Sequence, residues 1–306
     1  MIPDLAFLGP LPELHLHLDG SLRLDTLKAL AEDQGAELPG RDLRFTPGMS
    51  LRAALERFEI TLGVLQRPEA VRRVADEICQ DAAAQGVTTL ELRFAPQLHR
   101  GAPPEEIIDA ALDGLAGRAG LILCGLYGEP PAVLEGHVEA ARLRPGVVGV
   151  DLAGGPSSGD RFRLQDYAPA FAQARALGLG RTVHAGEGRP PQEIRVAVEA
   201  LHAQRIGHGT TLLEESTIVD LLLERGVTVE ACLSSNLHTG AIASLSAHPL
   251  RRWIELGVEV CVCADNALFS DTTAANELTL ARDHCGLSQS DLRAAVASGH
   301  AAKFVR

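Results

Sequence analysis

Eight short apolar segments recur along the chain of 306 residues, and most of the gaps between them have helical periodicity. A short apolar run predicts a buried strand, and a gap with apolar residues spaced about 3.6 apart predicts a helix. Residues 71–85, 164–177 and 214–225 are gaps of this kind. Several of the helices are expected to end at a glycine, namely Gly86, Gly178, Gly226 and Gly257. The expected strands are residues 13–18, 88–94, 120–126, 147–152, 181–185, 205–207, 228–232 and 259–264.

Eight strands joined by helical crossovers predict an α/β protein with a closed (β/α)8 TIM barrel. The alternative is a doubly wound open sheet, but no Gly-rich phosphate loop opens a helix after the first expected strand. No long linker and no repeat divides the chain, so residues 1–306 are expected to form a single barrel domain. Residues 36–67 interrupt the alternation after the first strand. We expect this insertion to be a lid or substrate loop at the barrel mouth.

The charge of the chain argues against polyanionic partners. It carries 40 acidic and 28 basic residues, a net charge of -12, and its Lys and Arg residues form no cluster beyond short pairs. Nucleic acid and anionic membranes are therefore not expected to bind, because both need clustered basic side chains. A small substrate that is neutral or weakly charged fits better.

The apolar runs and the cysteines indicate a cytoplasmic protein. The longest apolar runs are far shorter than the roughly 20 residues that span a bilayer, and residues 1–12 lack the basic start of a signal peptide. Six cysteines in 306 residues are too few for a disulfide framework. Four of them lie in apolar, strand-like runs, so we expect them to be reduced.

The first expected strand alternates polar residues with leucines. In the segment from Glu13 to Asp19, a period of two sends His15 and His17 to one face and the leucines to the other. Two imidazoles would then point into the barrel. They could simply hydrogen-bond to neighbouring groups, but burying them together is unfavourable without a partner, and a metal ion is such a partner.

Three later strands also end in residues that can bind metal or move protons. His184 and Glu187 lie at the end of the fifth strand, His208 at the end of the sixth, and Asp265 at the end of the eighth. In a barrel, these ends meet at the face that carries the active site. Imidazoles with one carboxylate suit zinc best, although iron(II), cobalt(II) or manganese(II) would also fit. The Cys261-Val-Cys263 pair is expected to fill the barrel rather than bind metal.

Together these motifs resemble the adenosine deaminase family of zinc hydrolases. The resemblance rests on His15-Leu-His17-Leu-Asp19-Gly20, His184-Ala-Gly-Glu187, Arg205-Ile-Gly-His208-Gly and Ala264-Asp265-Asn266. It extends to Leu90-Glu-Leu-Arg-Phe-Ala-Pro96, Val150-Asp-Leu-Ala-Gly-Gly155, Ser234-Ser-Asn236 and His248-Pro249. These motifs follow the family's order and approximate spacing, over roughly residues 10–280.

The resemblance implies one zinc ion per chain and a set of catalytic residues. The implied zinc ligands are His15, His17, His184 and Asp265. Glu187 would protonate N1 of the purine and so make C6 electrophilic. His208 would orient the attacking hydroxide and act as the base, with Asp265 assisting.

The resemblance also implies the contacts to substrate. Asp19 would bind the ribose, Gly154 the N3 edge of the purine and Asn266 the N7 edge, and His17 also counts among the substrate contacts. Many family members have Asp where this chain has Asn266. Since N7 of a neutral purine only accepts hydrogen bonds, an Asn amide can donate to it at any pH. Asp19 favours a nucleoside over a free base, because adenine-specific relatives tend to carry Glu there.

The expected reaction is the zinc-dependent deamination of a 6-aminopurine nucleoside, adenosine to inosine plus ammonia. Alternatives with the same chemistry are the deamination of adenine or of aminodeoxyfutalosine. A mononuclear metal-dependent amidohydrolase acting on an amide or phosphoester is a further alternative. A second metal held by a modified lysine is not expected, because Lys28 and Lys303 are the chain's two lysines and neither lies on a central strand. A non-catalytic barrel is disfavoured by the presence of Glu187, His208 and Asp265, and the sequence leaves the oligomeric state open.

Overall fold

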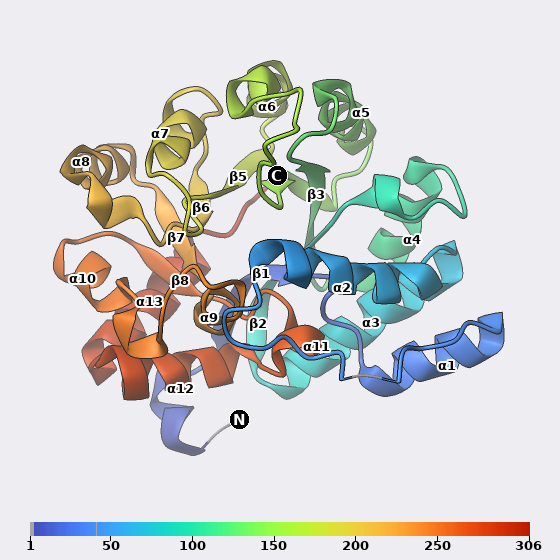
Figure 1. The fold of residues 1–306 in the computed structure, drawn as a ribbon, viewed down its shortest axis with the longest axis horizontal. Helices are drawn as coiled ribbons and strands as arrows, with labels where there is room; N and C mark the ends of the chain where they lie inside the picture. Colours follow the sequence, from blue (N-terminus) through green and yellow to red (C-terminus); the bar gives the residue numbers. More distant parts are fainter. Residues whose placement is uncertain (1–2, 41) are drawn as a thin grey trace.

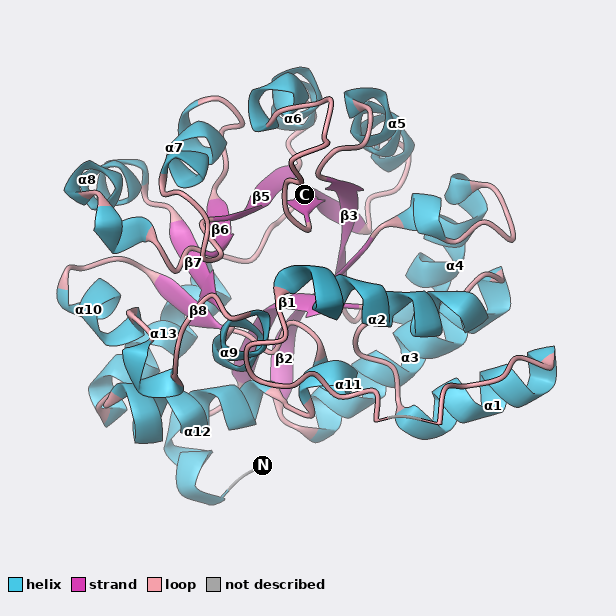
Figure 2. Cartoon of the chain, in the orientation of Figure 1, coloured by secondary structure: helices cyan, strands magenta, loops and turns pink. Residues whose placement is uncertain are grey.

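The eight predicted strands form one barrel of parallel strands in the computed structural model, which describes residues 3–40 and 42–306. The strands follow one another around the barrel in chain order, with helices outside them (Figures 1 and 2). The prediction of a (β/α)8 TIM barrel is therefore confirmed. The strands are β1 Leu11–His17, β2 Val87–Phe94, β3 Gly120–Leu126, β4 Val147–Ala153, β5 Gly180–Ala185, β6 Arg205–His208, β7 Thr228–Ala231 and β8 Val260–Val262.

Helices connect the strands and cover the outside of the barrel (Figure 1). The α-helices are α1 Leu24–Gln34, α2 Leu51–Val64, α3 Pro68–Ala84, α4 Pro104–Leu115, α5 Pro131–Ala141, α6 Ala168–Ala176, α7 Gln192–Glu199, α8 Ser216–Arg225, α9 Leu233–Thr239, α10 Leu250–Glu255, α11 Ala267–Ser270, α12 Ala274–Cys285 and α13 Gln289–Ala301. Short 3-10 helices are η1 Pro3–Leu8, η2 Pro96–Leu98, η3 Leu164–Tyr167, η4 Leu212–Glu214 and η5 Leu245–Ala247. None of the helices in the described ranges is long and apolar enough to cross a membrane.

Helix α3 shows how the sequence sets these elements. Pro68 occupies its first turn, where the missing N–H costs no hydrogen bond. Val71, Val74 and Ile78 recur at helical spacing and are buried against the barrel. The predicted glycine stop follows at Gly86, whose φ of 81° lies in the left-handed region that suits a residue without a side chain.

One expected helix is divided. The segment predicted as a helix over residues 164–177 begins as η3 and continues as α6 from Ala168. Proline in the first turn of α6 lacks the N–H that would continue the preceding turn as one helix. Strand boundaries differ from the predicted ones by at most two residues, and β8 is shorter than predicted at both ends.

The barrel closes between β1 and β8 through very few main-chain contacts. An isolated bridge joins Leu16 to Asp265. Around it, the Asp265 N–H donates to the His15 carbonyl (2.8 Å) and the His17 N–H donates to the Asp265 carbonyl (2.8 Å). The buried Glu13 carboxylate adds two contacts by accepting from the backbone N–H groups of His15 (3.0 Å) and Ala264 (2.8 Å). The seam of the barrel thus runs through three of the predicted metal ligands.

The insertion at residues 36–67 contains α2, which lies over β1 in Figure 1. Six residues of α2 line the same cavity as His17 at the end of β1, namely Leu51, Ala54, Leu55, Phe58, Glu59 and Leu62. This location is the one expected for a substrate loop. Its action as a lid remains a prediction.

Candidate metal and catalytic site

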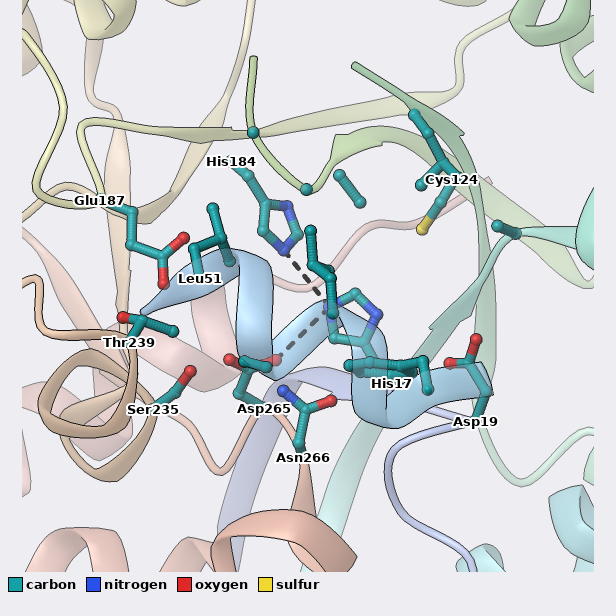
Figure 3. A pocket seen from close by; sticks show the side chains of 18 of the residues that line it. His17, Asp19, Leu51, Cys124, His184, Glu187, Ser235, Thr239, Asp265 and Asn266 are labelled. Atoms are coloured by element: carbon teal, nitrogen blue, oxygen red, sulfur yellow. Dashed lines mark hydrogen bonds and ion pairs between the residues drawn. The ribbon is translucent and has the colours of Figure 1, made fainter. Parts of the chain in front are cut away.

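A cavity of about 290 Å³ opens at the C-terminal ends of the strands. It brings together eight of the nine predicted site residues: His17, Asp19, Gly154, His184, Glu187, His208, Asp265 and Asn266. The ninth, His15, is fully buried and has an edge-on ring contact with His208, with ring centroids 5.1 Å apart. Residues from five strand ends or the loops that follow them therefore meet in one place (Figure 3).

Imidazole nitrogens and one carboxylate converge at the base of this cavity (Figure 3). The Nε2 atom of His17 lies 3.3 Å from Nε2 of His184 and 3.4 Å from Oδ1 of Asp265. The Nε2 atom of His15 lies 3.5 Å from the same oxygen, and it is buried without a hydrogen-bond partner among the described residues. Nitrogen lone pairs and carboxylate oxygens at such short separations are the donor set of a tetrahedral or five-coordinate zinc site. The four residues present fit the metal that the family resemblance implies.

Buried carboxylates hold the far side of two of these imidazoles. Glu230 accepts from Nδ1 of His15 (2.6 Å), and Asp151 lies 3.1 Å from Nδ1 of His184. A carboxylate that accepts the Nδ1 proton leaves the Nε2 lone pair free for a metal, which is the usual arrangement behind metal-binding histidines. Arg93 joins the two carboxylates, with 2.9 Å to each.

The charges around His15 favour a cation at this point. Burial and the Arg93 charge act to lower the pKa of His15, but the nearby carboxylates of Asp265 and Glu230 raise that pKa to about 9. Burial alone would raise the pKa of the Glu230 carboxyl, yet the charges of Arg93 and Arg205 hold it below its usual value. Either a proton or a metal ion on His15 would supply the positive charge that these carboxylates stabilise.

Two of the site residues have left-handed backbone although neither is glycine. The φ angle is 68° at His208 and 63° at Asp265. Such conformations cost on the order of 1–3 kcal/mol and cluster at functional sites. A close approach also explains the glycine of the first motif, because a Cβ on Gly20 would lie 2.1 Å from Oδ1 of Asn266.

Glu187 is a buried carboxyl group with a raised pKa. Its side chain is buried, and burial raises its pKa to about 7, an effect that the nearby Arg189 charge partly offsets. Nη1 of Arg189 lies 3.5 Å from the Glu187 carboxylate, which in turn lies 4.0 Å from Nε2 of His208. A carboxyl group with a pKa near the working pH can both hold and release a proton.

Two further groups that line the cavity have polar atoms without partners among the described residues. One oxygen of Asp19 and the Oδ1 atom of Asn266 are buried without a hydrogen bond to any described residue. Burial raises the pKa of Asp19 to about 7. Gly154 also lines the cavity, with a φ of 78° and nothing within 4 Å of the position where a Cβ would stand. Because unpaired buried polar atoms are costly, these atoms mark positions where a ligand would hydrogen-bond.

The cysteines lie mainly inside the barrel. All six are free within residues 3–40 and 42–306. Cys261 and Cys263 are fully buried, with their sulfur atoms 3.5 Å apart, and they pack with Leu14 as the barrel-filling residues that we expected. Sequence reasoning missed Cys232, whose sulfur lies within 4.8 Å of ligand atoms of His15 and Asp265.

Sequence reasoning also assigned no function to the groups that orient the site. Arg93, Asp151, Asn236 and His248 occur in motifs noted above, but their partners lie far away in the chain. Tyr127 lies in none of these motifs, and its hydroxyl donates to the His184 carbonyl (2.7 Å). The residues of this outer layer could not be paired from spacing alone.

A (β/α)8 barrel with clustered imidazoles and carboxylates at its C-terminal mouth defines a barrel hydrolase. The comparisons with known proteins specify which kind. Residues 10–306 match the family model described as adenosine deaminase. The chain belongs to the adenosine deaminase family and is a deaminase hydrolase that acts on C–N bonds. This result favours the deaminase prediction over the amide, phosphoester and non-catalytic alternatives.

Relatives and solved structures match most of the chain. It is 32% identical over 314 residues to an adenosine deaminase of Clostridium kluyveri, with 96% of this chain and 89% of that protein covered. A solved adenine deaminase of Arthrobacter aurescens is 26% identical, with a TM-score of 0.88 and coverage of 97% and 94%. An Arabidopsis ADAL structure complexed with IMP is 27% identical, with a TM-score of 0.85 and coverage of 97% and 92%. The chain covers 38% of a longer Dictyostelium discoideum relative, to which it is 35% identical over 299 residues.

Proposed function

We propose that this protein catalyses the zinc-dependent hydrolytic deamination of a 6-aminopurine nucleoside, namely adenosine to inosine plus ammonia. The observation that carries the proposal is the convergence of the His15, His17 and Asp265 donor atoms on a cavity that also contains the buried acid Glu187. A metal-binding corner and a proton donor on one cavity supply the two activations that hydrolysis of an aromatic amine requires.

The donor set supports one zinc ion per chain, held by His15, His17, His184 and Asp265. When bound, the metal would act as a Lewis acid and lower the pKa of the attacking water. Glu230 and Asp151 would keep the His15 and His184 rings in place through their Nδ1 atoms.

The protein's own groups handle the protons. Glu187 donates its proton to N1 of the purine as the new C6–O bond forms, so that the electron pair of the C6=N1 bond moves onto N1. His208 and Asp265 lie on the same cavity, and between them they would orient the attacking oxygen and receive the proton that it loses. That proton then leaves with the amino group as ammonia, and the C6 hydroxyl proton returns to Glu187.

The walls of the cavity favour a nucleoside. The unpaired Asp19 oxygen would accept from a ribose hydroxyl. Asn266 and Gly154 line the cavity and would bind the purine edges, with the Asn266 amide nitrogen donating to N7. The described residues that line the cavity include no Lys or Arg, so a 5′-phosphate would find no cation there. Glu59 on α2 would also repel it.

Adenine remains the second candidate, because the Arthrobacter aurescens neighbour is an adenine deaminase. Aminodeoxyfutalosine is a third aminopurine that the same chemistry could accept. The single barrel domain, the cytoplasmic location and action on a free small molecule are part of the same proposal.

The test is ammonia release from a panel of aminopurines by purified protein with a measured zinc content. Adenosine is expected to give the highest kcat/KM, adenine and AMP much lower values. If adenine or AMP were deaminated with a higher kcat/KM than adenosine, that compound would be the substrate instead of adenosine. Turnover that persists after complete zinc removal would contradict the proposed metal dependence.

A further inference from the structure

A chain of hydrogen bonds connects the start of a surface helix to His208 in the cavity. The backbone N–H of Leu250, the first residue of α10, donates to Nδ1 of His248 (3.1 Å). Nε2 of His248 lies 3.2 Å from Oδ1 of Asn236, and Nδ2 of Asn236 lies 2.9 Å from Nδ1 of His208. The relay defined by His248, Asn236 and His208 thus begins at the backbone N–H of Leu250, which always carries its proton.

That fixed proton determines the direction of every bond in the relay. A backbone N–H can only donate, so Nδ1 of His248 accepts and the proton of this neutral ring is on Nε2. Nε2–H must then face an acceptor, which makes the near atom of Asn236 its carbonyl oxygen. The amide nitrogen of Asn236 therefore donates to Nδ1 of His208. Since Nδ1 accepts, the proton of His208 is on Nε2.

Burial and packing of the three side chains preserve these donor and acceptor roles. Asn236, His208 and His248 are 0%, 2% and 4% exposed, so water does not compete for their hydrogen bonds. Burial lowers the pKa of His248 to about 3, so its ring stays neutral across the physiological range. The ring of His248 also packs edge-on against Trp253, with ring centroids 5.2 Å apart, which restricts its rotation.

We propose that Asn236 is a positioning residue that holds His208 as its Nε2–H tautomer, so that His208 donates a hydrogen bond to the attacking oxygen. This inference rests on the proposed function and narrows it. A ring nitrogen that carries a proton has no lone pair for a metal or for a second proton. His208 therefore stands outside the metal-ligand set although its nitrogen lies within 4.8 Å of those of His15 and His184.

The tautomer changes which residue acts as the base. The family resemblance implies that His208 is the base, whereas the relay makes it a donor that orients the oxygen toward C6. Asp265 is then the group that receives the proton of the attacking water. Changing the partner of a catalytic histidine between Asn and Asp moves its ring proton, and in serine proteases such a swap costs about 10⁴ in kcat.

The test is nitrogen NMR of protein labelled with ¹⁵N-histidine, loaded with zinc, with the His208 signals assigned by comparison with His208→Gln. We expect a protonated Nε2 and an unprotonated Nδ1 in the wild-type protein. Asn236→Asp places an acceptor against Nδ1, so that nitrogen should gain a proton. Zinc content should stay at the wild-type level, while kcat should fall by about 10²- to 10⁴-fold with a smaller change in KM. The matched control is Asn276→Asp on the exposed start of α12, which should change none of these quantities.

Each contrary outcome overturns a defined part of the proposal. A wild-type His208 with an unprotonated Nε2 would refute the tautomer, and it needs no variant to fold. Loss of zinc from Asn236→Asp would place His208 among the metal ligands. An unchanged kcat would show that the tautomer does not matter for turnover. If the wild-type protein deaminated no aminopurine, the proposed function would fail while the NMR spectrum would still decide the tautomer.

Discussion

The two ends of the barrel both bury charged groups, but they do so in different ways. At the N-terminal end, Arg205 pairs with Glu91 (2.5 Å) and Glu230 (2.7 Å), and its guanidinium lies 3.7 Å from the ring centroid of Phe304. At the C-terminal mouth, nitrogen and oxygen atoms of His15, Asp19 and other residues remain buried without partners.

The difference separates groups that stabilise the fold from groups that await a ligand. Glu230 belongs to both ends, because one of its oxygens faces Arg205 and the other faces His15. A buried ion pair with added hydrogen bonds is a structural element. Unpaired polar atoms beside left-handed backbone at His208 and Asp265 are instead typical of a functional site. Substitutions at the mouth should therefore affect activity, and those at the opposite end should affect stability.

The largest effect is expected for His184→Ala at the mouth. Removal of one of four ligands should abolish zinc binding and reduce ammonia release to background, with the barrel still folded. Metal analysis and a turnover assay on the same sample measure both effects. His284→Ala on the exposed end of α12 is the matched control and should retain both. Full activity of the His184 variant after chelation would place the metal site elsewhere.

Glu187→Gln should retain zinc and bind nucleoside but lose kcat by about 10²- to 10⁴-fold, as expected for a general acid. Because the wild-type pKa is raised to about 7, the protonated form is lost as the pH rises through that value. The wild-type kcat/KM should therefore fall on the alkaline side, and the variant should lack this limb. The measurement is a pH series on both proteins. A near-normal kcat in the variant would end the assignment of Glu187 as the acid.

Asn266 should contribute through a single hydrogen bond to the purine. With 7-deazaadenosine, which lacks the N7 acceptor, transition-state stabilisation by the wild-type protein should fall by roughly 1–3 kcal/mol. Asn266→Ala should lose a similar amount with adenosine and little more with the analogue. The measurement is kcat/KM of the wild-type protein and of Asn266→Ala, each with adenosine and with 7-deazaadenosine. Equal rates of the wild-type protein on both substrates would show that N7 is not read.

At the other end of the barrel, Phe304→Ala should lower the free energy of unfolding by about 1–3 kcal/mol and leave kcat/KM nearly unchanged. The ring covers Arg205 and fills the space beside Gly180, where a Cβ would meet it at 2.0 Å. Leu143→Ala, at a side chain that is 84% exposed, is the control and should change stability little. If Phe304→Ala reduced turnover strongly, the two ends would be coupled through Glu230.

The sequence predicted the parts of the molecule that depend on local pattern. The alternation of leucine with His15 and His17 places both imidazoles on one face, and the rule that barrel strands end at the active face then gathers His184 and Asp265. This reasoning needs only periodicity and element order. It gave the fold and the composition of the cavity, in which eight of nine predicted residues lie.

The partners behind the site could not be predicted in the same way. Glu230 and His15 are 215 positions apart in the sequence, and their contact depends on the width of the barrel interior. The same holds for the bond between Asn236 and His208, which fixes a proton that no sequence pattern encodes. Left-handed backbone at Asp265 is also set by the surrounding structure, since aspartate adopts it only occasionally.

The seam between β1 and β8 has a consequence for the order of events during synthesis. His15 and His17 emerge from the ribosome near the start of translation, whereas Asp265 emerges near its end. Domains generally fold as units during synthesis. Here the segments of the first and last strands are joined by the Leu16–Asp265 bridge and by the contact of Glu13 with Ala264. A nascent chain can therefore not complete its metal-binding corner until almost all of the barrel has been made. Binding of the metal would then report that the N-terminal and C-terminal segments of the barrel have come into contact.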